Sequence, residues 1–199
     1  MPEIKHSSHR SVGLFIGLIL ILSFSCIRTV PAGGSDSALI NFSAVFVGGS
    51  CVISTSETQI IFGSGDLISP ATIVSSPPQT SFNVVLSSCS GQGLTPKITI
   101  SGESTVLYGP ALFRDPMPVS ASEGYGILLS TSGNSSFNSN ENLAQNKIIS
   151  VKNWSTQTQL SDLDTILPVK AELTCGNCDY SGRSSGDLQA TVTFNFVYD

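Results

Sequence analysis

The C-terminal segment 186–199 constrains this chain more than any other part of its sequence. Apolar or aromatic residues occupy every second position over eleven residues, and polar residues fill most of the positions between them. A period of two places all the large apolar side chains on one face of an extended strand. The apolar positions are Leu188, Ala190, Val192, Phe194, Phe196 and Tyr198.

The outer edge of this strand needs a partner. Only Asp199 follows Tyr198 in the sequence, so we expect no later segment to pair with that edge. An apolar strand with an unpaired edge is prone to aggregate unless another strand covers it. We therefore expect the function of the chain to depend on what covers the C-terminal strand.

The N-terminal segment has the features of a secretory signal. Basic residues, among them Lys5 and Arg10, precede a continuous apolar run of thirteen residues at 12–24. A membrane-spanning helix needs about 20 apolar residues, whereas a run of this length suits the apolar centre of a signal peptide. We predict an exported chain without stable membrane insertion.

The cleavage site divides the chain into three parts. Small residues favour cleavage after Ala32, which gives a signal peptide over 1–32, a short extension over 33–37 and one domain over 38–199. Cleavage after Ser25 is an alternative. A lipidated Cys26 is a third possibility.

Charge and histidine content exclude several classes of function. The chain has nine Lys and Arg and fourteen Asp and Glu, and segment 1–32 holds three of the basic residues and one of the acidic residues. The remaining chain therefore has six basic and thirteen acidic residues, a net charge of −7. Such an acidic chain does not suit nucleic acid or an anionic membrane surface. Both histidines, His6 and His9, precede the cleavage site, which excludes Ser-His-acid triads and His-containing metal sites.

Paired carboxylates are the remaining candidate for catalysis. Asp162 and Asp164 are close in sequence, but two acids in a polar stretch indicate a solvated loop rather than an active site. We predict that the protein is not an enzyme and has no cofactor or metal.

The cysteines indicate two disulfides. With Cys26 set aside, four cysteines remain, an even number that is typical of exported domains. Of the three possible pairings, we predict Cys51–Cys89 and Cys175–Cys178. The first would close a loop of 38 residues, which stabilises by about 4 kcal/mol in the chain-entropy model.

The Cys-Gly-Asn-Cys motif has two further interpretations. A redox dithiol of this spacing belongs at a helix N-terminus, whereas here it follows the strand-like run 167–173, and Gly176 and Asn177 favour a turn. A zinc site of four cysteines would need a second closely spaced pair. We interpret the motif as a disulfide-closed turn.

Alternating apolar residues predict a series of short strands, separated by turns rich in Gly, Pro, Asn and Ser. No stretch predicts an amphipathic helix of ten residues or more, so we predict an all-β sandwich. Before the C-terminal strand, the expected strands are 38–49, 60–62, 82–89, 97–101, 126–130, 147–154 and 166–173. Residues 108–118 and 131–142 are expected to be loops, the second one solvated around Phe137.

Several of these features occur together in one known family. Gly186 stands fourteen residues from the C-terminus, and Tyr198 is penultimate. Cys51 and Cys89 lie about forty residues apart, and apolar runs lead into both of them. In these motifs the chain resembles, over 38–199, the subunits of bacterial chaperone–usher fimbriae of the type 1 pilin kind.

The resemblance implies a fold and a set of partners. It implies an incomplete immunoglobulin-like β-sandwich that lacks its final strand and is completed by donor-strand exchange. A periplasmic chaperone would first lend a strand, and basic chaperone residues would hold the C-terminal carboxylate. At an outer-membrane usher, the N-terminal extension of a neighbouring subunit would replace that strand, in a fimbria on the cell surface. The residues implied to bind chaperone or neighbour are Gly186, Leu188, Ala190, Val192, Phe194, Phe196, Tyr198 and Asp199.

The chain departs from the family pattern in two places. The Cys175–Cys178 disulfide is not a general family feature. The extension 33–37 has no large apolar side chain for a neighbour's groove, whereas cleavage after Ser25 would restore Ile27 and Val30.

The expected function is a major or minor structural subunit of a fimbria. A base or terminating subunit is an alternative within the same family. The alternative from another class is a self-complete secreted β-sandwich that binds a ligand. The chain is too short for a two-domain tip adhesin.

Overall fold

The structure is a computed structural model that describes residues 48–116 and 121–199. The predicted signal peptide 1–32, its alternative end at Ser25 and the extension 33–37 lie outside the described residues. Most of the expected strand 38–49 lies outside them as well.

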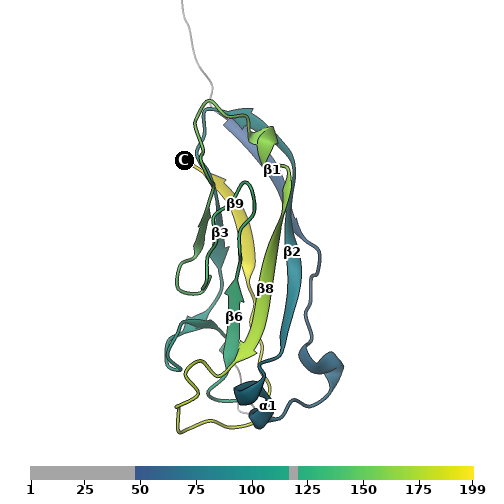
Figure 1. The fold of residues 1–199 in the computed structure, drawn as a ribbon, viewed down its shortest axis with the longest axis vertical. Helices are drawn as coiled ribbons and strands as arrows, with labels where there is room; N and C mark the ends of the chain where they lie inside the picture. Colours follow the sequence, from purple (N-terminus) through teal and green to yellow (C-terminus); the bar gives the residue numbers. More distant parts are fainter. Residues whose placement is uncertain (1–47, 117–120) are drawn as a thin grey trace, which may run out of the picture. The chain divides into compact units, whose positions relative to one another are not determined.

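The described chain forms two antiparallel β-sheets (Figure 1). The larger sheet has, in spatial order, β1 (Gly48–Thr55), β2 (Gln79–Gln92), β8 (Thr165–Thr174), β6 (Gly126–Ser130), β5 (Leu112–Phe113) and β4 (Ser104–Thr105). The smaller sheet has the order β7 (Ile148–Ser150), β3 (Pro96–Ser101) and β9 (Thr193–Tyr198). The predicted all-β fold is confirmed.

The core lies between the two sheets. Alternate residues of β2 and β8, including Val84 and Leu167, are fully buried and share one cluster with Ile98 of β3 and Ile149 of β7. Burying one such aliphatic side chain stabilises the fold by about 1.5–3 kcal/mol. Two antiparallel sheets that share one core in this way are typical of an immunoglobulin-like sandwich.

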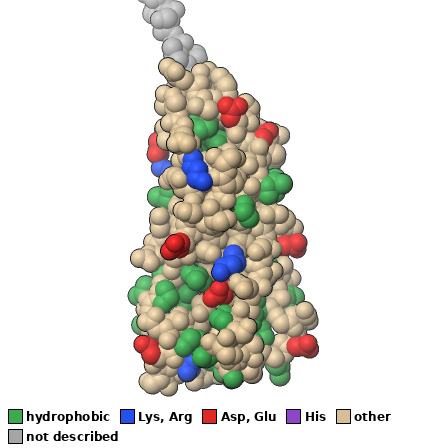
Figure 2. Space-filling model, in the orientation of Figure 1, with side chains coloured by type: hydrophobic (Ala, Val, Ile, Leu, Met, Phe, Trp, Pro, Cys, Tyr) green, Lys and Arg blue, Asp and Glu red, His purple; other side chains and the backbone are tan. Residues whose placement is uncertain are grey.

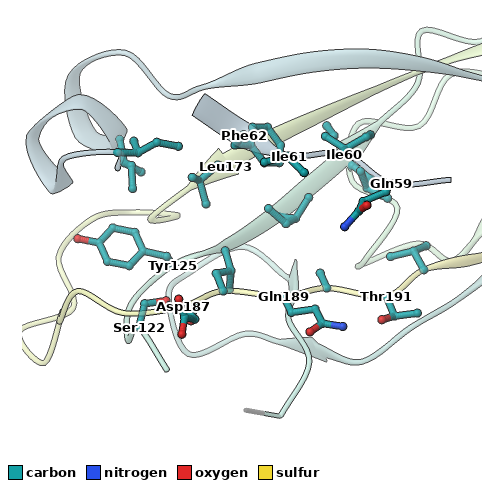
Figure 3. A pocket seen from close by; sticks show the side chains of 18 of the residues that line it. Gln59, Ile60, Ile61, Phe62, Ser122, Tyr125, Leu173, Asp187, Gln189 and Thr191 are labelled. Carbon is teal, nitrogen blue, oxygen red and sulfur yellow. Dashed lines mark hydrogen bonds between the residues drawn. The ribbon is translucent and has the colours of Figure 1, made fainter. Parts of the chain in front are cut away.

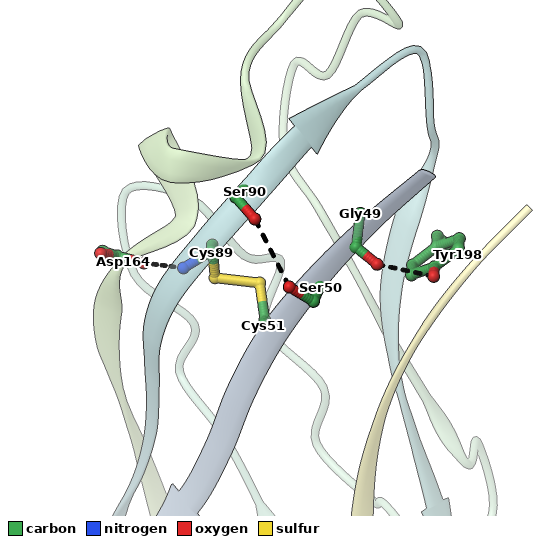
Figure 4. Close-up of a disulfide and its surroundings, with 7 residues drawn as sticks. All are labelled: Gly49, Ser50, Cys51, Cys89, Ser90, Asp164 and Tyr198. Carbon is green, nitrogen blue, oxygen red and sulfur yellow. Dashed lines mark hydrogen bonds between the residues drawn. A yellow bond between two sulfur atoms is a disulfide. The ribbon is translucent and has the colours of Figure 1, made fainter. Parts of the chain in front are cut away.

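The first described strand extends further than expected. We expected a strand that ends before Cys51, but β1 continues through Cys51 to Thr55 because Ser50 and Val52 pair with β2. Both expected disulfides are present, and Cys51–Cys89 joins β1 to β2 (Figure 4). The carboxylate of Asp164 accepts a hydrogen bond of 2.8 Å from the backbone N–H of Cys89.

The described helices are all short. They are the 3-10 helices η1 (Phe62–Gly65) and η2 (Leu160–Leu163) and the α-helix α1 (Pro70–Ser75). Ser69 caps α1 by accepting a hydrogen bond from the Thr72 N–H, and proline takes the first helical position. The expected strand at 60–62 is wrong, since Ile61 is 64% exposed and η1 begins at Phe62.

Two expected loops contain buried structure. In 131–142, Phe137 is fully buried, and the Asn140 side-chain amide donates to the backbone carbonyls of Asn146 and Ile148 at 2.7 and 3.0 Å. This loop is therefore solvated only in part, since Ser135, Asn138 and Glu141 are exposed as predicted while Phe137 and Asn140 are buried. In 108–118, both residues of β5 are fully buried.

The remaining strand predictions differ in their bounds. The strands expected at 97–101, 126–130 and 166–173 correspond to β3, β6 and β8. The strand expected over 147–154 is limited to the three residues of β7. Across 48–116 and 121–199, no helix is both long enough and apolar enough to cross a membrane.

Candidate functional site

A groove with a volume of about 1290 Å³ opens between the edges of the two sheets. One wall runs from Thr55 at the end of β1 to Pro70, and the other from Ser185 to Phe194 at the start of β9. Figure 3 shows Gln59–Phe62 on one side of the groove and Asp187, Gln189 and Thr191 on the other. Side chains of β2, β6 and β8 form its floor.

One edge of β9 faces this groove with unpaired backbone groups. Thr95 and Asp199 exchange two backbone hydrogen bonds, each of 3.2 Å, at the end of the β3–β9 ladder. In an antiparallel ladder, hydrogen-bonded and non-hydrogen-bonded pairs alternate. The backbone N–H and C=O groups of Phe194 and Phe196 therefore point away from β3. Within the described part of the chain, no strand pairs with β9 on that side.

The side chains of this wall follow the predicted period of two. Ala190, Val192, Phe194 and Phe196 are half-buried and pack against the main core, whereas the residues between them up to Asn195 are exposed. The regular strand is shorter than predicted, because β9 begins only at Thr193. The period in burial nevertheless extends back to Leu188.

Side chains from neighbouring loops hold the irregular part of this wall. The carboxylate of Asp115 accepts hydrogen bonds from the N–H and hydroxyl of Thr191 at 3.0 and 2.7 Å. The backbone N–H of Asp115 donates to the carbonyl of Gln189, and the N–H of Ser122 donates to the carbonyl of Asp187. Segment 185–192 therefore has one edge occupied by these contacts.

The opposite wall continues from the end of β1. β1 is the edge strand of the larger sheet, and its ladder with β2 is extended by one hydrogen bond from the Ser56 N–H to the Asn83 carbonyl. Ile60 and Phe62 are half-buried against the core, while Ile61 and Leu67 are exposed. Apolar side chains therefore flank the groove on both sides.

The charged side chains that line the groove are all acidic. Glu57 and Asp66 belong to one wall and Asp187 to the other, and none of the described lining residues is Lys or Arg. These three carboxylates form no ion pair with a described residue. On the face that Figure 2 shows, few side chains are charged. An occupant with cationic groups fits this lining better than an acidic one.

The two strands come together at one end of the groove. The hydroxyl of Tyr198 donates a hydrogen bond of 2.7 Å to the carbonyl oxygen of Gly49 (Figure 4). Lys97 forms an ion pair of 2.5 Å with the side chain of Asp199.

The residues predicted for partner binding are divided between the groove and its closed end. Those that line the groove are Gly186, Leu188, Ala190, Val192 and Phe194. Phe196, Tyr198 and Asp199 lie beyond the lining, toward the closed end, although the free backbone edge at Phe194 continues to Phe196. The opposite wall and the floor were not predicted from the sequence, because their approach to 185–194 depends on long-range contacts.

The acidic residues of the described chain are not gathered into a metal site. No group of three or more potential metal ligands occurs among residues 48–116 and 121–199. Asp164 is engaged with the backbone of Cys89, and Asp162 lies in η2. What the groove offers is a row of free backbone groups beside alternating apolar side chains, which suits an added β-strand.

The chain is similar to solved structures alone. No protein-family model and no curated protein sequence matches the chain. Among solved structures, 13 chains match. One is a crystal structure of the P pilus rod subunit PapA, with 18% sequence identity and a TM-score of 0.43 over 81% of this chain and 100% of that chain. The assignment of an all-β sandwich rests on the sheets of this chain itself.

Proposed function

We propose that this protein is a structural subunit of a chaperone–usher fimbria and that its groove accepts a β-strand from a partner. The observation that carries the proposal is the groove between β1 and β9, where an unpaired strand edge lies beside half-buried apolar side chains. A self-complete sandwich would cover such an edge. Most of the residues that line the groove are apolar, which suits strand addition.

The incoming strand must meet three requirements set by the groove. It supplies backbone hydrogen bonds to Phe194 and Phe196, and it is extended. Because apolar residues recur at every second position from Leu188 to Phe194, it presents about four apolar side chains to the groove. A cationic residue near Glu57, Asp66 or Asp187 adds electrostatic complementarity.

Two partners in succession meet these requirements in the proposed assembly. A periplasmic chaperone supplies the strand after export, and the N-terminal extension of a neighbouring subunit replaces it at the outer-membrane usher. The subunit then becomes part of a fibre on the cell surface. The donor segment of this chain lies between Cys26 and Ser37, and N-terminal sequencing of the exported protein decides between cleavage after Ser25 and after Ala32.

Periplasmic expression tests the proposal directly. Without a chaperone of the chaperone–usher class, we expect the exported chain to aggregate or be degraded, because its groove exposes an apolar strand edge. With the chaperone co-expressed, we expect a soluble complex of one chaperone and one subunit. Equal yields of soluble monomer from the periplasm with and without the chaperone would contradict the proposal.

A further inference from the structure

The turn closed by the Cys175–Cys178 disulfide lies at the end of the groove that is remote from Tyr198. Cys175 follows β8 directly and is fully buried, and Cys178 is half-buried. The two cysteines share an apolar cluster with Ile73, Tyr125 and Leu173. These three residues also line the groove. The disulfide therefore packs behind side chains that form the groove's surface.

The disulfide-closed turn is held against Tyr108. The backbone N–H of Asn177 donates a hydrogen bond of 2.8 Å to the carbonyl of Tyr108. Gly176 has φ +63°, and a Cβ at this position would collide with the same carbonyl. Cys178 also has a positive φ, of 60°. This backbone path is unfavourable for most residues, and the disulfide fixes the two ends of the turn.

Contacts continue from Tyr108 to the groove wall. The Tyr108 ring packs edge-on against Tyr180 at 5.1 Å between centroids, and its hydroxyl donates to the carboxylate of Glu123 at 2.8 Å. Glu123 and Ser184 exchange two backbone hydrogen bonds of 3.0 and 3.1 Å. Ser122 then donates from both its N–H and its hydroxyl to the carbonyl of Asp187. An unbroken series of contacts therefore links the turn to the wall.

This linkage matters because the wall beside it is not part of a regular sheet. Residues 185–192 have no continuous ladder with a neighbouring strand, in contrast to β9, which pairs with β3 along its whole length. Their position depends on separate anchoring contacts. A wall that shifts by a fraction of a hydrogen-bond length cannot present its backbone and side chains to an incoming strand in register.

We infer that the Cys175–Cys178 disulfide is a positioning element of the groove, which fixes the wall 184–191 and thereby increases the affinity for an incoming strand. The effect on affinity rests on the proposed function, whereas the effect on the wall does not. The disulfide itself does not touch the strand. It acts through Tyr108, Glu123 and Ser122.

Hydrogen exchange of the wall is the first test. The chain is refolded from urea under oxidising conditions, with and without the double substitution Cys175→Ala and Cys178→Ala. We expect the amides that anchor the wall, those of Asp115, Ser122, Glu123, Ser184 and Thr191, to exchange at least about tenfold faster in the variant, while the amides of β2 exchange at the same rate. Unchanged exchange at these anchoring amides would overturn the inference.

A second variant covers the case in which the double substitution prevents folding. Gly176→Ala keeps the disulfide but places a Cβ against the Tyr108 carbonyl, so we expect the same local loss of protection. Gly48→Ala is the matched control, since a Cβ there meets no atom within 4 Å. Equal exchange in these two variants would also count against the linkage.

Strand affinity is measured with a synthetic peptide in which Val alternates with Thr and which has Lys at both ends. We expect the double Cys variant to bind this peptide about tenfold more weakly than the wild-type chain. Its wall is no longer held in place before the peptide binds, so binding must also order the wall. Equal affinity would overturn the inference on strand binding. If the wild-type chain binds no peptide and is a stable monomer, the proposed function fails, and the exchange comparison still decides whether the disulfide fixes the wall.

Discussion

The hydroxyl of Tyr198 donates a hydrogen bond of 2.7 Å to the carbonyl oxygen of Gly49. This bond joins β9 of the smaller sheet to β1 of the larger one, at the closed end of the groove (Figure 4). From there the two edges diverge, and the lining of the groove begins at Thr55 on one side and at Phe194 on the other. The gap between β1 and β9 is therefore closed at the end near Tyr198 and open at the other end.

Removing this hydrogen bond should have a modest effect. Tyr198 is 41% exposed, so we expect Tyr198→Phe to lower the free energy of unfolding by about 1 kcal/mol, the usual net contribution of one hydrogen bond. The change is measured as a shift of the urea midpoint of the refolded chain. A midpoint that does not move would show that the bond does not hold the two strands together.

In the wall that leads into β9, a charged substitution should be tolerated at a solvent-facing position but not at a position that faces the groove. Val192 is half-buried and lines the groove, whereas its neighbour Thr193 is exposed. We expect Val192→Asp to abolish complex formation with the co-expressed chaperone, because a carboxylate would be buried without a partner. Thr193→Asp is the matched control and should retain the complex. If both variants form the complex equally, the wall has been assigned to the wrong face.

The acidic lining should select cationic strands. We expect a Val-Thr peptide with Lys ends to bind about three- to tenfold more tightly than the same peptide with Glu ends at low salt, since each exposed ion pair contributes up to about 1 kcal/mol. The difference should fade at high salt. It should also disappear in the triple variant Glu57→Gln, Asp66→Asn and Asp187→Asn. Equal binding of both peptides at low salt would contradict this account.

Tyr108 should make the fold sensitive to alkali. The side chain is 2% exposed, and burial raises the pKa of its phenol. A raised pKa in the folded state stabilises the fold fully below the ordinary tyrosine pKa of about 10, and this stabilisation is lost as the pH rises through the folded-state value. We expect Tyr108→Phe to reduce the loss of stability above pH 10, as followed by urea denaturation.

The control for this prediction is Tyr180→Phe, which changes the ring that packs against Tyr108. We expect the alkaline loss of stability to persist in this variant. If Tyr108→Phe and the wild-type chain lose stability equally above about pH 10, another group controls the alkaline transition.

The strands that could be predicted from the sequence are those in which apolar and polar residues alternate. In β2 and β8, alternate apolar residues are buried against the facing sheet, so periodicity and burial agree. The same argument predicted which side chains of 188–196 face inward, although a regular strand forms only from Thr193.

The predictions that failed concern segments whose structure depends on distant partners. Ile60–Phe62 has an apolar sequence, but no described strand pairs with it, and a strand needs a neighbour to satisfy its backbone. Residues 131–142 have a polar composition, yet the asparagine side chains bond to the backbone and let Phe137 be buried. Composition alone does not show such pairing.

The candidate site was only half predictable for the same reason. The period of two identified the wall that leads into β9. The facing wall, the acidic lining and the contacts of Asp115 and Ser122 bring together residues far apart in the sequence. A local sequence pattern cannot show that residues so far apart in the sequence lie close together in the fold.

The central claim is that a partner strand pairs with the free edge of β9, and residue-resolved amide exchange tests it most directly. The ladder with β3 leaves the N–H groups of Phe194 and Phe196 free and engages those of Asn195 and Val197. When the Lys-ended Val-Thr peptide is added, we predict that exchange slows at least about tenfold at Phe194 and Phe196 and remains unchanged at Asn195 and Val197. Equal slowing at all four positions, or none at Phe194 and Phe196, would contradict strand addition at this edge.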